Sequence, residues 1–356
     1  MEKFDRVYIG TGPISVADSC HFSKENRKTL FIDDKAQVGG AWVAISIGDY
    51  GELEIGCHIW SYNKKVYRFL EEFFDLDLID LTPQPYFLKG SLKLGYDQKH
   101  AITTLKSFGQ KLSKGQVKSA LKFLSNDPSA RIPVIPKKYR YPRGGARDLQ
   151  KSIATKIAAN GFTTMLGRKV TSLKRNADLW ELDLSNDEKI AAETVVLTAT
   201  SAIEEIVMGD QKMSIEHKST NYTHYHLVVK GNPKKPCSYV RVLGHPFIHR
   251  ISEITYQLET AREQEETAYI VGVFDDQLHA GLSENEIAEK LISYLTQHGF
   301  IGSDNALIYA QKNKFETTYI PRDQRPILNA LPNIELLATT DLIYGFHGRM
   351  ETWSIV

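Results

Sequence analysis

Residues 6–42 read RVYIGTGPISVADSCHFSKENRKTLFIDDKAQVGGAW, and they predict more about the fold than any other stretch of this 356-residue chain. Residues 6–10 form a short apolar run that enters a glycine turn, as a buried parallel strand does. A helical pattern follows over residues 14–24, and a second apolar run at residues 29–32 ends on two acids. This order is typical of a βαβ unit that binds a dinucleotide. We therefore expect an α/β fold built around such a unit.

The glycine turn carries the first two glycines of the motif G-x-G-x-x-G, at Gly10 and Gly12. Gly10 permits the tight turn, and Gly12 lets backbone N–H groups approach a pyrophosphate at the helix N-terminus. Ser15 stands at the third position and is small enough for the helix to pack near the strand. Asp33 follows at a spacing of roughly 20 residues, where an acid binds the adenosine ribose. The alternative is that Asp33 and Asp34 are a solvated strand end. The residues expected to contact the dinucleotide here are Gly10, Gly12, Pro13, Ile14, Ser15, Asp33 and Asp34.

Composition excludes several classes of protein. The chain is 42% apolar, enough for a sizeable core, and its length allows two domains or one large α/β body with an embedded module. Its 44 basic and 43 acidic side chains nearly balance, so nothing points to nucleic acid or an acidic membrane as a partner. Three widely spaced cysteines make neither a disulfide framework nor a zinc site, and no apolar run is long enough to span a membrane. We expect a cytoplasmic protein with no signal peptide, metal or membrane span that acts on a small-molecule substrate.

The stretch D-x-x-x-x-x-G-G-x-W, from Asp33 to Trp42, distinguishes an FAD site from a simple NAD site. It resembles the N-terminal signature of FAD-dependent enzymes in the glutathione-reductase-like superfamily. The likeness is greatest to the branch of amine oxidases, protoporphyrinogen oxidase, carotenoid desaturases and UDP-galactopyranose mutase. In that branch the glycine pair lies against the central part of FAD, whereas the alternative is a glycine hairpin with Trp42 in the core. The resemblance implies FAD contacts at Gly39, Gly40, Ala41 and Trp42.

A second stretch, GCHIWS at residues 56–61, is similar to the segment G-x-H-x-F-H-T of UDP-galactopyranose mutases. His58 matches the first family histidine, and Ser61 falls where the second would be. That departure leaves any chemistry of a histidine pair open. The resemblance implies that His58 lies beside the flavin, while the alternative is a hydrogen-bonded histidine of the core. Residues 63–74, which follow, have the apolar spacing of a helix.

The middle of the chain also resembles amine-oxidase-like flavoproteins. Residues 141–145, YPRGG, precede a helical pattern at residues 146–160 and two strand patterns. In that family the valine that corresponds to Val170 touches the adenine through its backbone. The alternative for Val170 is a residue of the strand core, and the two interpretations can hold together. Residues 194–200, TVVLTAT, match the strand that returns to the cofactor, which implies a contact at Thr200.

The C-terminal stretch carries the last part of the resemblance. Residues 334–340 match the final cofactor strand, and Asp341 stands where superfamily members place an acid on the ribityl or pyrophosphate part of FAD. Residues 344–353, YGFHGRMETW, are similar to the G-R-L-x-x-Y stretch of UDP-galactopyranose mutases. The resemblance implies that Arg349 lies by the flavin and the substrate phosphates, with Met350 also at the cofactor. The long closing helix of the family is expected to be short or absent.

Residues 221–274 contain four short β-rich runs separated by turn residues, which predicts an antiparallel sheet. His224 and His226 share one face of their strand. No nearby acid or cysteine completes a metal site, so polar residues on an open sheet face are the favoured interpretation. Further on, Tyr319 is expected to line a substrate pocket, since the loop before the last cofactor strand often faces the substrate in this superfamily.

These observations predict an α/β protein with a Rossmann-like FAD-binding domain assembled from discontinuous segments, plus a smaller substrate domain with an antiparallel sheet. The FAD-binding domain is expected to comprise residues 1–80, 141–205 and 326–356. Residues 81–140 are expected to form a helical and hairpin insertion, and residues 206–325 the substrate domain.

The expected function is that of an FAD-dependent, amine-oxidase-like oxidoreductase that oxidises a small molecule by hydride transfer to flavin. The alternative is a flavoenzyme like UDP-galactopyranose mutase, which acts on a nucleotide sugar without net redox change. A flavin-binding protein that lacks catalysis is a third possibility. The candidate catalytic residues are Arg349, His58 and Tyr319, and the substrate, the electron acceptor and the oligomeric state are left open.

Overall fold

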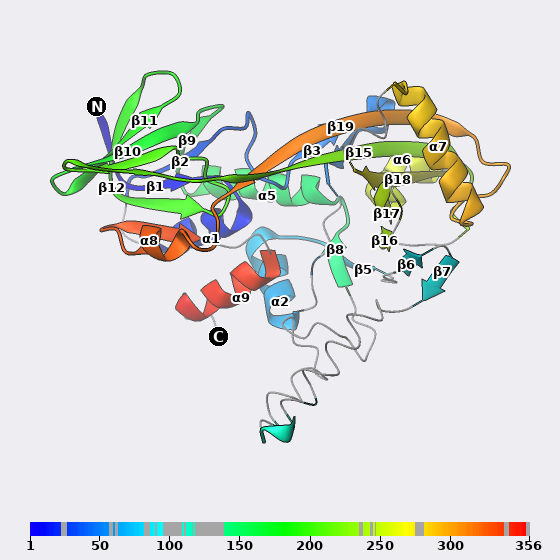
Figure 1. Ribbon diagram of the computed structural model, residues 1–356, viewed down its shortest axis with the longest axis horizontal. Helices are drawn as coiled ribbons and strands as arrows, with labels where there is room; N and C mark the ends of the chain where they lie inside the picture. Colours follow the sequence, from blue (N-terminus) through cyan, green and yellow to red (C-terminus); the bar gives the residue numbers. More distant parts are fainter. Residues whose placement is uncertain are drawn as a thin grey trace.

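A computed structural model describes most of the chain, and Figure 1 shows two sheets at opposite ends of the molecule. The strands β15 (Lys218–Lys230) and β19 (Leu307–Tyr319) run from one sheet toward the other. The described residues are 1–22, 27–56, 60, 63–81, 86–89, 91–94, 109, 112–115, 117, 139–234, 238–242, 245, 247–274, 281–337 and 342–353. Among these residues, no helix is long and apolar enough to cross a membrane.

The larger sheet has a parallel centre whose strand order matches the doubly wound class. Its strands are β1 (Glu2–Ile9), β2 (Thr29–Asp33), β9 (Thr163–Leu166), β12 (Lys189–Thr198) and β20 (Ile334–Leu337). They pair in parallel in the order β9-β2-β1-β12-β20, which is 3-2-1-4-5 in chain order. The direction of winding reverses between β1 and β12, and ligands of this fold class bind beyond the carboxyl ends of the strands at such a reversal. The expected α/β fold is confirmed, and it points to the end of β1 as the place for a site.

A further group of strands widens this sheet on the side of β12. It consists of β10 (Val170–Asn176), β11 (Leu179–Leu184), β13 (Glu205–Met208) and β14 (Gln211–Ser214), and it is antiparallel except for the parallel pair β10 and β13. β11 pairs with the first half of β12 and β20 with the second half, so β12 borders three strands. Trp180 on β11 is fully buried, and its indole N–H donates to the Pro332 carbonyl, just before β20, at 2.9 Å. This bond ties together the two strands that share one edge of β12.

Helices cover both faces of the larger sheet. One layer consists of α1 (Pro13–Phe22), α2 (Lys64–Phe74), α5 (Ala146–Ala159) and α9 (Leu342–Thr352), and α8 (Arg325–Asn329) lies on the other face. Alternate residues of β1 reach the two layers, since Tyr8 packs with the first group of helices and Val7 with Leu328 of α8. Burial on both faces is what a parallel strand needs. The helices expected over residues 63–74 and 146–160 are confirmed, and the closing helix α9 has 11 residues.

The second sheet is antiparallel except for one pair of strands. Besides β15 and β19 it contains β6 (Tyr86–Lys89), β7 (Ser91–Leu94), β16 (Val240–Val242), β17 (Ile248–Glu253) and β18 (Glu266–Val273). Their order is β19-β15-β18-β17-β16-β6-β7, with β16 and β6 parallel. The antiparallel sheet predicted from residues 221–274 is therefore confirmed. The helical part of the insertion expected at residues 81–140 lies largely outside the described residues, and the domain boundaries stay a prediction.

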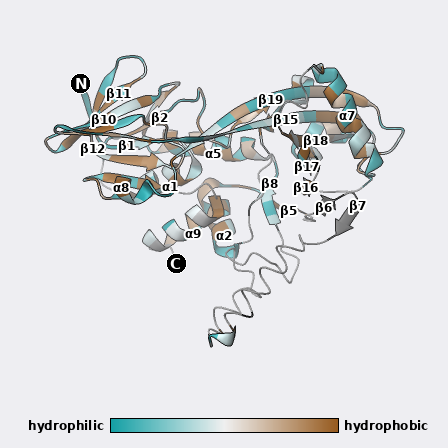
Figure 2. Cartoon of the chain, viewed as in Figure 1, coloured by the Kyte–Doolittle hydropathy of each residue, from teal (hydrophilic) through white to brown (hydrophobic). Residues whose placement is uncertain are grey.

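One face of the second sheet is covered by the helix α7 (Glu284–Gln297). Alternate apolar residues of β15, among them Leu227 and Val229, pack with Leu291 and Leu295 of the helix. Figure 2 shows hydrophobic and hydrophilic segments alternating along α7, as expected of a helix with one buried face. Ser283 begins the helix with a capping box, in which its side chain and that of Glu286 exchange hydrogen bonds with backbone N–H groups.

The remaining elements are short. They are the ribbon of β3 (Ala44–Ser46) with β4 (Glu52–Glu54), the ribbon of β5 (Leu78–Leu81) with β8 (Tyr139–Pro142), and the short helices η1 (Gly48–Tyr50), η2 (Thr255–Gln257) and α6 (Glu259–Glu263). The N–H of Ile320, directly after β19, donates to the Ala199 carbonyl at 2.9 Å. The end of β19 therefore meets the carboxyl end of β12.

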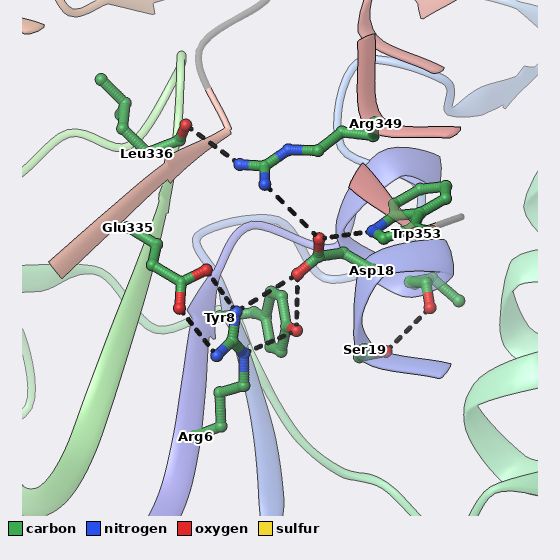
Figure 3. Close-up of polar contacts among 9 residues, drawn as sticks. Arg6, Tyr8, Asp18, Ser19, Glu335, Leu336, Arg349 and Trp353 are labelled. Atoms are coloured by element: carbon green, nitrogen blue, oxygen red, sulfur yellow. Dashed lines mark hydrogen bonds and ion pairs between the residues drawn. The ribbon is translucent and has the colours of Figure 1, made fainter. Parts of the chain in front are cut away.

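A buried charge network centred on Asp18 of α1 joins four elements of the larger half (Figure 3). The Asp18 carboxylate accepts from the Tyr8 hydroxyl at 2.9 Å and from Arg6 at 3.4 Å, both on β1. Its other oxygen accepts the indole N–H of Trp353, at the end of α9, at 3.1 Å. Arg6 also binds Glu335 of β20 with two nitrogens, at 2.9 and 2.5 Å. Since the Asp18 side chain is fully buried, the hydrogen bonds of the network replace those that water would make to its carboxylate.

We expect Asp18→Ala to lower the free energy of unfolding by about 2–4 kcal/mol, because the Tyr8 hydroxyl and the Trp353 indole N–H would lose their buried acceptor, while Arg6 would keep Glu335. Urea unfolding followed by circular dichroism measures this change. Asp34→Ala is the matched control, since Asp34 is exposed and its removal should change stability by no more than about 0.5 kcal/mol. An equal effect of the two variants would contradict a structural role for the network.

Candidate functional site

The glycine turn lies where the carboxyl ends of β1 and β12 meet. Gly10 has φ +116, and a Cβ there would lie 2.9 Å from the side chain of Thr198 at the end of β12. The Ser201 hydroxyl donates to the Ile9 carbonyl at 2.8 Å and accepts from the Thr198 N–H at 2.9 Å. Only glycine fits this turn, because both the backbone angle and the contact exclude a side chain.

Asp33 closes the loop around the turn. Its carboxylate accepts from the N–H and the hydroxyl of Thr11 at 2.9 and 2.5 Å, and from the Lys35 N–H at 3.0 Å. The Thr11 hydroxyl in turn accepts from the Gly39 N–H at 3.0 Å. Burial raises the pKa of Asp33, although the bonds from Thr11 and Lys35 act in the opposite direction. The solvated strand end left open by the sequence therefore describes the exposed Asp34, but not Asp33.

An open space adjoins Gly12 at the start of α1. A Cβ on Gly12 would meet no atom within 4 Å, whereas a Cβ on Gly40 would lie 3.4 Å from the Gly12 Cα. The first turn of a helix leaves backbone N–H groups without intrahelical partners, at the positive end of the helix dipole. Space, free donors and positive potential together suit a phosphate group. The residues present therefore fit the diphosphate of a dinucleotide.

The other predicted residues of the first 42 differ in burial. Pro13 begins α1, Ile14 is half-buried and Ser15 is 1% exposed inside the helix. Ala41 is exposed, and the half-buried Trp42 packs edge-on against Trp60, with ring centroids 5.9 Å apart. Thr11 and Ser201 were missed by the sequence reasoning. The only feature of the sequence that could have identified them is a small hydroxyl side chain beside each predicted loop.

The remaining cofactor candidates are spread over other elements. Val170 begins β10 and is buried in the sheet core. Thr200 is exposed beyond β12, with its hydroxyl 3.3 Å from that of Thr198. Met350 is buried among the helices. Asp341 lies outside the described residues.

The catalytic candidates contact different elements. Arg349 on α9 donates to the Leu336 carbonyl of β20 at 3.4 Å, and its guanidinium lies 4.0 Å from Asp18 (Figure 3). Tyr319 is half-buried at the end of β19, next to the loop that follows β12. His58 lies outside the part of the chain that the structure describes. Where they are described, these candidates are thus held in separate surroundings, and their catalytic roles stay a prediction.

His224 and His226 are not on an open sheet face, so that expectation was wrong. Both are fully buried, because the end of β4 covers this side of the second sheet. A ring N–H of His224 donates to the Ile55 carbonyl, and one of His226 to the Glu54 carbonyl, each at 2.9 Å. Among the described residues there is no group of three or more side chains that could hold a metal.

The second nitrogen of each histidine ring accepts a hydrogen bond, so both rings are neutral. His226 accepts from the Asn313 amide at 2.9 Å, and His224 accepts from Arg250 at 2.7 Å. Burial lowers the pKa of His226 to about 4. Burial and the positive charge of Arg250 lower the pKa of His224 to about 2. The pair therefore joins β4 to the second sheet without adding charge at neutral pH.

Comparison with known proteins confirms the fold. No protein-family model matches the sequence, and neither does any curated protein. Putrescine oxidase with bound putrescine superposes with a TM-score of 0.66 at 12% identity, over 99% of this chain and 98% of that one. Reduced UDP-galactopyranose mutase superposes at 0.64 and 12% identity, over 93% and 89%. An oxidoreductase from Methanosarcina mazei superposes at 0.59 and 13% identity, over 98% and 100%. The chain therefore shares the fold of these enzymes along almost its whole length.

The buried histidines predict a loss of stability in mild acid. Between pH 6.5 and about 4, His226 is protonated in the unfolded chain and neutral in the folded one. Stability should therefore fall as the pH is lowered, by roughly 1.4 kcal/mol per pH unit for each such imidazole. His226→Gln keeps an N–H donor for the Glu54 carbonyl and cannot titrate, so its loss should be shallower than that of the natural protein.

Urea unfolding at a series of pH values measures the difference in slope between the two proteins. His347→Gln serves as the control, because His347 is exposed and its replacement should leave the slope unchanged. If the natural protein and His226→Gln lose stability in parallel, His226 is not buried as a neutral ring.

Proposed function

We propose that the protein is an FAD-dependent oxidoreductase that oxidises a small-molecule substrate by hydride transfer to the flavin. The observation that carries the proposal is the open space beside Gly12 at the first turn of α1, with Gly40 packed close to Gly12. It lies at the reversal of winding between β1 and β12, where this fold class binds its ligands. When bound, FAD would supply an isoalloxazine ring that accepts a hydride.

In this proposal the residues of the glycine turn hold the cofactor. The backbone around Gly12 binds the diphosphate, and Asp33 binds a ribose hydroxyl with the acceptor capacity that Thr11 and Lys35 leave over. Asp33 is buried whereas Asp34 is exposed. This difference supports two roles for Asp33, which would bind the ribose and also shapes the loop. The wider set of proposed contacts consists of Gly10, Pro13, Ile14, Ser15, Asp34, Ala41, Trp42, His58, Val170, Thr200, Asp341, Arg349 and Met350.

The proposed domain division follows from the same assignment. Residues 1–80, 141–205 and 326–356 would bind FAD, and residues 206–325 would hold the substrate. The separation of the two sheets in Figure 1 supports this division. Arg349 and Tyr319 are the proposed catalytic residues within the described chain. Arg349 also has a positioning role, because its guanidinium contacts Leu336 and lies near Asp18.

A mutase that acts on a nucleotide sugar is the second candidate function. The fold shared with reduced UDP-galactopyranose mutase supports it, as does the placement of Arg349 in a G-R stretch. Ser61, where those mutases have a second histidine, argues against it. Incubation of dithionite-reduced protein with nucleotide sugars separates the two functions. Isomerisation that requires reduction would favour the mutase, whereas oxygen-dependent oxidation of a small molecule would favour the oxidoreductase.

Binding of FAD is the first test of the proposal. Purified protein should be yellow, and heat-released flavin should have the mass of FAD. If the protein is purified without flavin, added FAD should raise the melting temperature, since a ligand at 100 times its Kd stabilises by about 2.7 kcal/mol. A colourless protein whose melting temperature does not respond to FAD would overturn the proposal.

Gly12→Ala offers a sharper test of the site. Gly12 is not among the residues with positive φ, and its Cβ would meet open space, so the change should leave the stability of the flavin-free protein unaltered. The methyl group would occupy the space proposed for the diphosphate and should weaken FAD binding by about tenfold or more. Gly348→Ala is the control, because it also adds a methyl group in open space without positive φ. Equal FAD affinity of both variants would exclude the diphosphate from this position.

A further inference from the structure

The edge of the larger sheet that carries the glycine turn extends over two further strands. β1, β2 and β9 are parallel neighbours in that order, with Ile9 opposite Ile32 and Asp33 opposite Leu166 (Figure 1). Their carboxyl ends therefore lie side by side, with neighbouring strands about 4.8 Å apart. A dinucleotide whose diphosphate lies beside Gly12, at the end of β1, would extend its ribose toward Asp33 at the end of β2. We expect the base that follows the ribose to lie toward the end of β9.

Two backbone hydrogen bonds fasten the turn after β9 to the segment after β2. The N–H of Gly167 donates to the Lys35 carbonyl at 2.8 Å, and the N–H of Arg168 donates to the Asp33 carbonyl at 3.0 Å. Gly167 has φ +66, and a Cβ there would meet no atom within 4 Å, so this turn borders open space. Asp33 is the residue proposed to bind the ribose, and the backbone of Arg168 is thus bonded to it directly.

Three basic residues lie at this turn, and they differ in their partners. The Lys35 ammonium lies 3.5 Å from the exposed Asp34 carboxylate, and the Lys169 ammonium donates to Glu204 at 2.7 Å. The Arg168 guanidinium forms no ion pair within the part of the chain that the structure describes. Its hydrogen bond there is to the carbonyl of the preceding residue, at 3.4 Å. Arg168 therefore offers a cation at the edge that the base would reach.

The charges near Arg168 favour a neutral aromatic partner over a phosphate. Asp33 and Asp34 are at the same edge of the sheet, and an acid at the end of β2 binds a ribose hydroxyl but would repel a phosphate at that position. A guanidinium is planar and weakly hydrated, so it stacks on aromatic rings and on nucleic-acid bases. Arg168 is half-buried, so less side-chain freedom is lost when it covers a ring than for a fully exposed arginine.

We propose that Arg168 binds the adenine of FAD by stacking its guanidinium on the base. This inference rests on the proposed function, since it adds a residue to the proposed cofactor site. It goes beyond the contact expected at Val170, which involves the backbone alone. A backbone group reaches the edge of a base, whereas a guanidinium covers its face, so the two contacts hold the adenine in different directions.

The test is the affinity of the flavin-free protein for FAD and for ADP, measured by isothermal titration calorimetry. Arg168→Ala should weaken both ligands by the same factor, roughly 3- to 30-fold, which corresponds to the loss of one contact between a cation and a ring. ADP carries the adenine but no flavin, so an equal factor supports a contact at the adenosine end. A loss of affinity for FAD alone would indicate a contact with the flavin and would overturn the inference.

Two further substitutions separate stacking from charge. Arg168→Tyr keeps a planar group without a charge and should retain more of the affinity for FAD than Arg168→Ala does. Arg168→Lys keeps the charge but not the planar group and should retain less than Arg168→Tyr. The reverse order, in which Arg168→Lys restores the affinity and Arg168→Tyr does not, would indicate that the residue binds a phosphate and would overturn the proposed stacking.

The matched control is Arg262→Ala, which removes an exposed arginine of α6 and should leave both affinities unchanged. All flavin-free variants should melt at the temperature of the natural protein, because backbone hydrogen bonds hold the turn at Arg168. If the natural protein binds neither FAD nor ADP, the proposed function fails and this inference fails with it. If the natural protein binds FAD and Arg168→Ala binds it equally tightly, the proposed function stands and this inference alone is overturned.

Discussion

The hydrogen bonds between Thr11, Asp33 and Gly39 hold together the part of the molecule on which the candidate cofactor site depends. They join the end of β1, the end of β2 and the glycine pair, which are separate in sequence. Because Asp33 accepts three bonds and is 5% exposed, the loop geometry is determined from inside the protein. The space beside Gly12 is a consequence of that geometry. A cofactor would therefore meet a site that is already formed.

The two sheets are connected by the end of β4 and by the long strands β15 and β19. The neutral rings of His224 and His226 bind backbone carbonyls of β4, so the antiparallel sheet is attached to the segment that follows the glycine pair. Ile320, directly after β19, binds the loop beyond β12. Both connections consist of hydrogen bonds without net charge. Such contacts attach the antiparallel sheet to the larger half through backbone carbonyls and N–H groups.

Much of the fold was predictable from local pattern. We expected the βαβ unit, the helix at residues 63–74 and the strands of the antiparallel sheet. Turn residues and apolar periodicity over a few residues indicate each of these elements. The candidate site was predictable at positions where the backbone requires glycine, as at Gly10. It was not predictable at Thr11, whose partner Asp33 is on another strand. The prediction of an open sheet face at His224 and His226 was wrong, because nothing in the sequence of their strand shows that β4 covers this face.

By itself, the sequence determined the class of fold and the position of the glycine turn, since both follow from spacing along the chain and from the room that a missing side chain leaves. Only the tertiary structure decided which polar residues are buried together. Asp18 joins Arg6, Tyr8 and Trp353, and the bulge at His249 turns Arg250 toward His224. These contacts link residues on different strands and helices. Their energy comes from the exclusion of water at the place of contact, which no local pattern records.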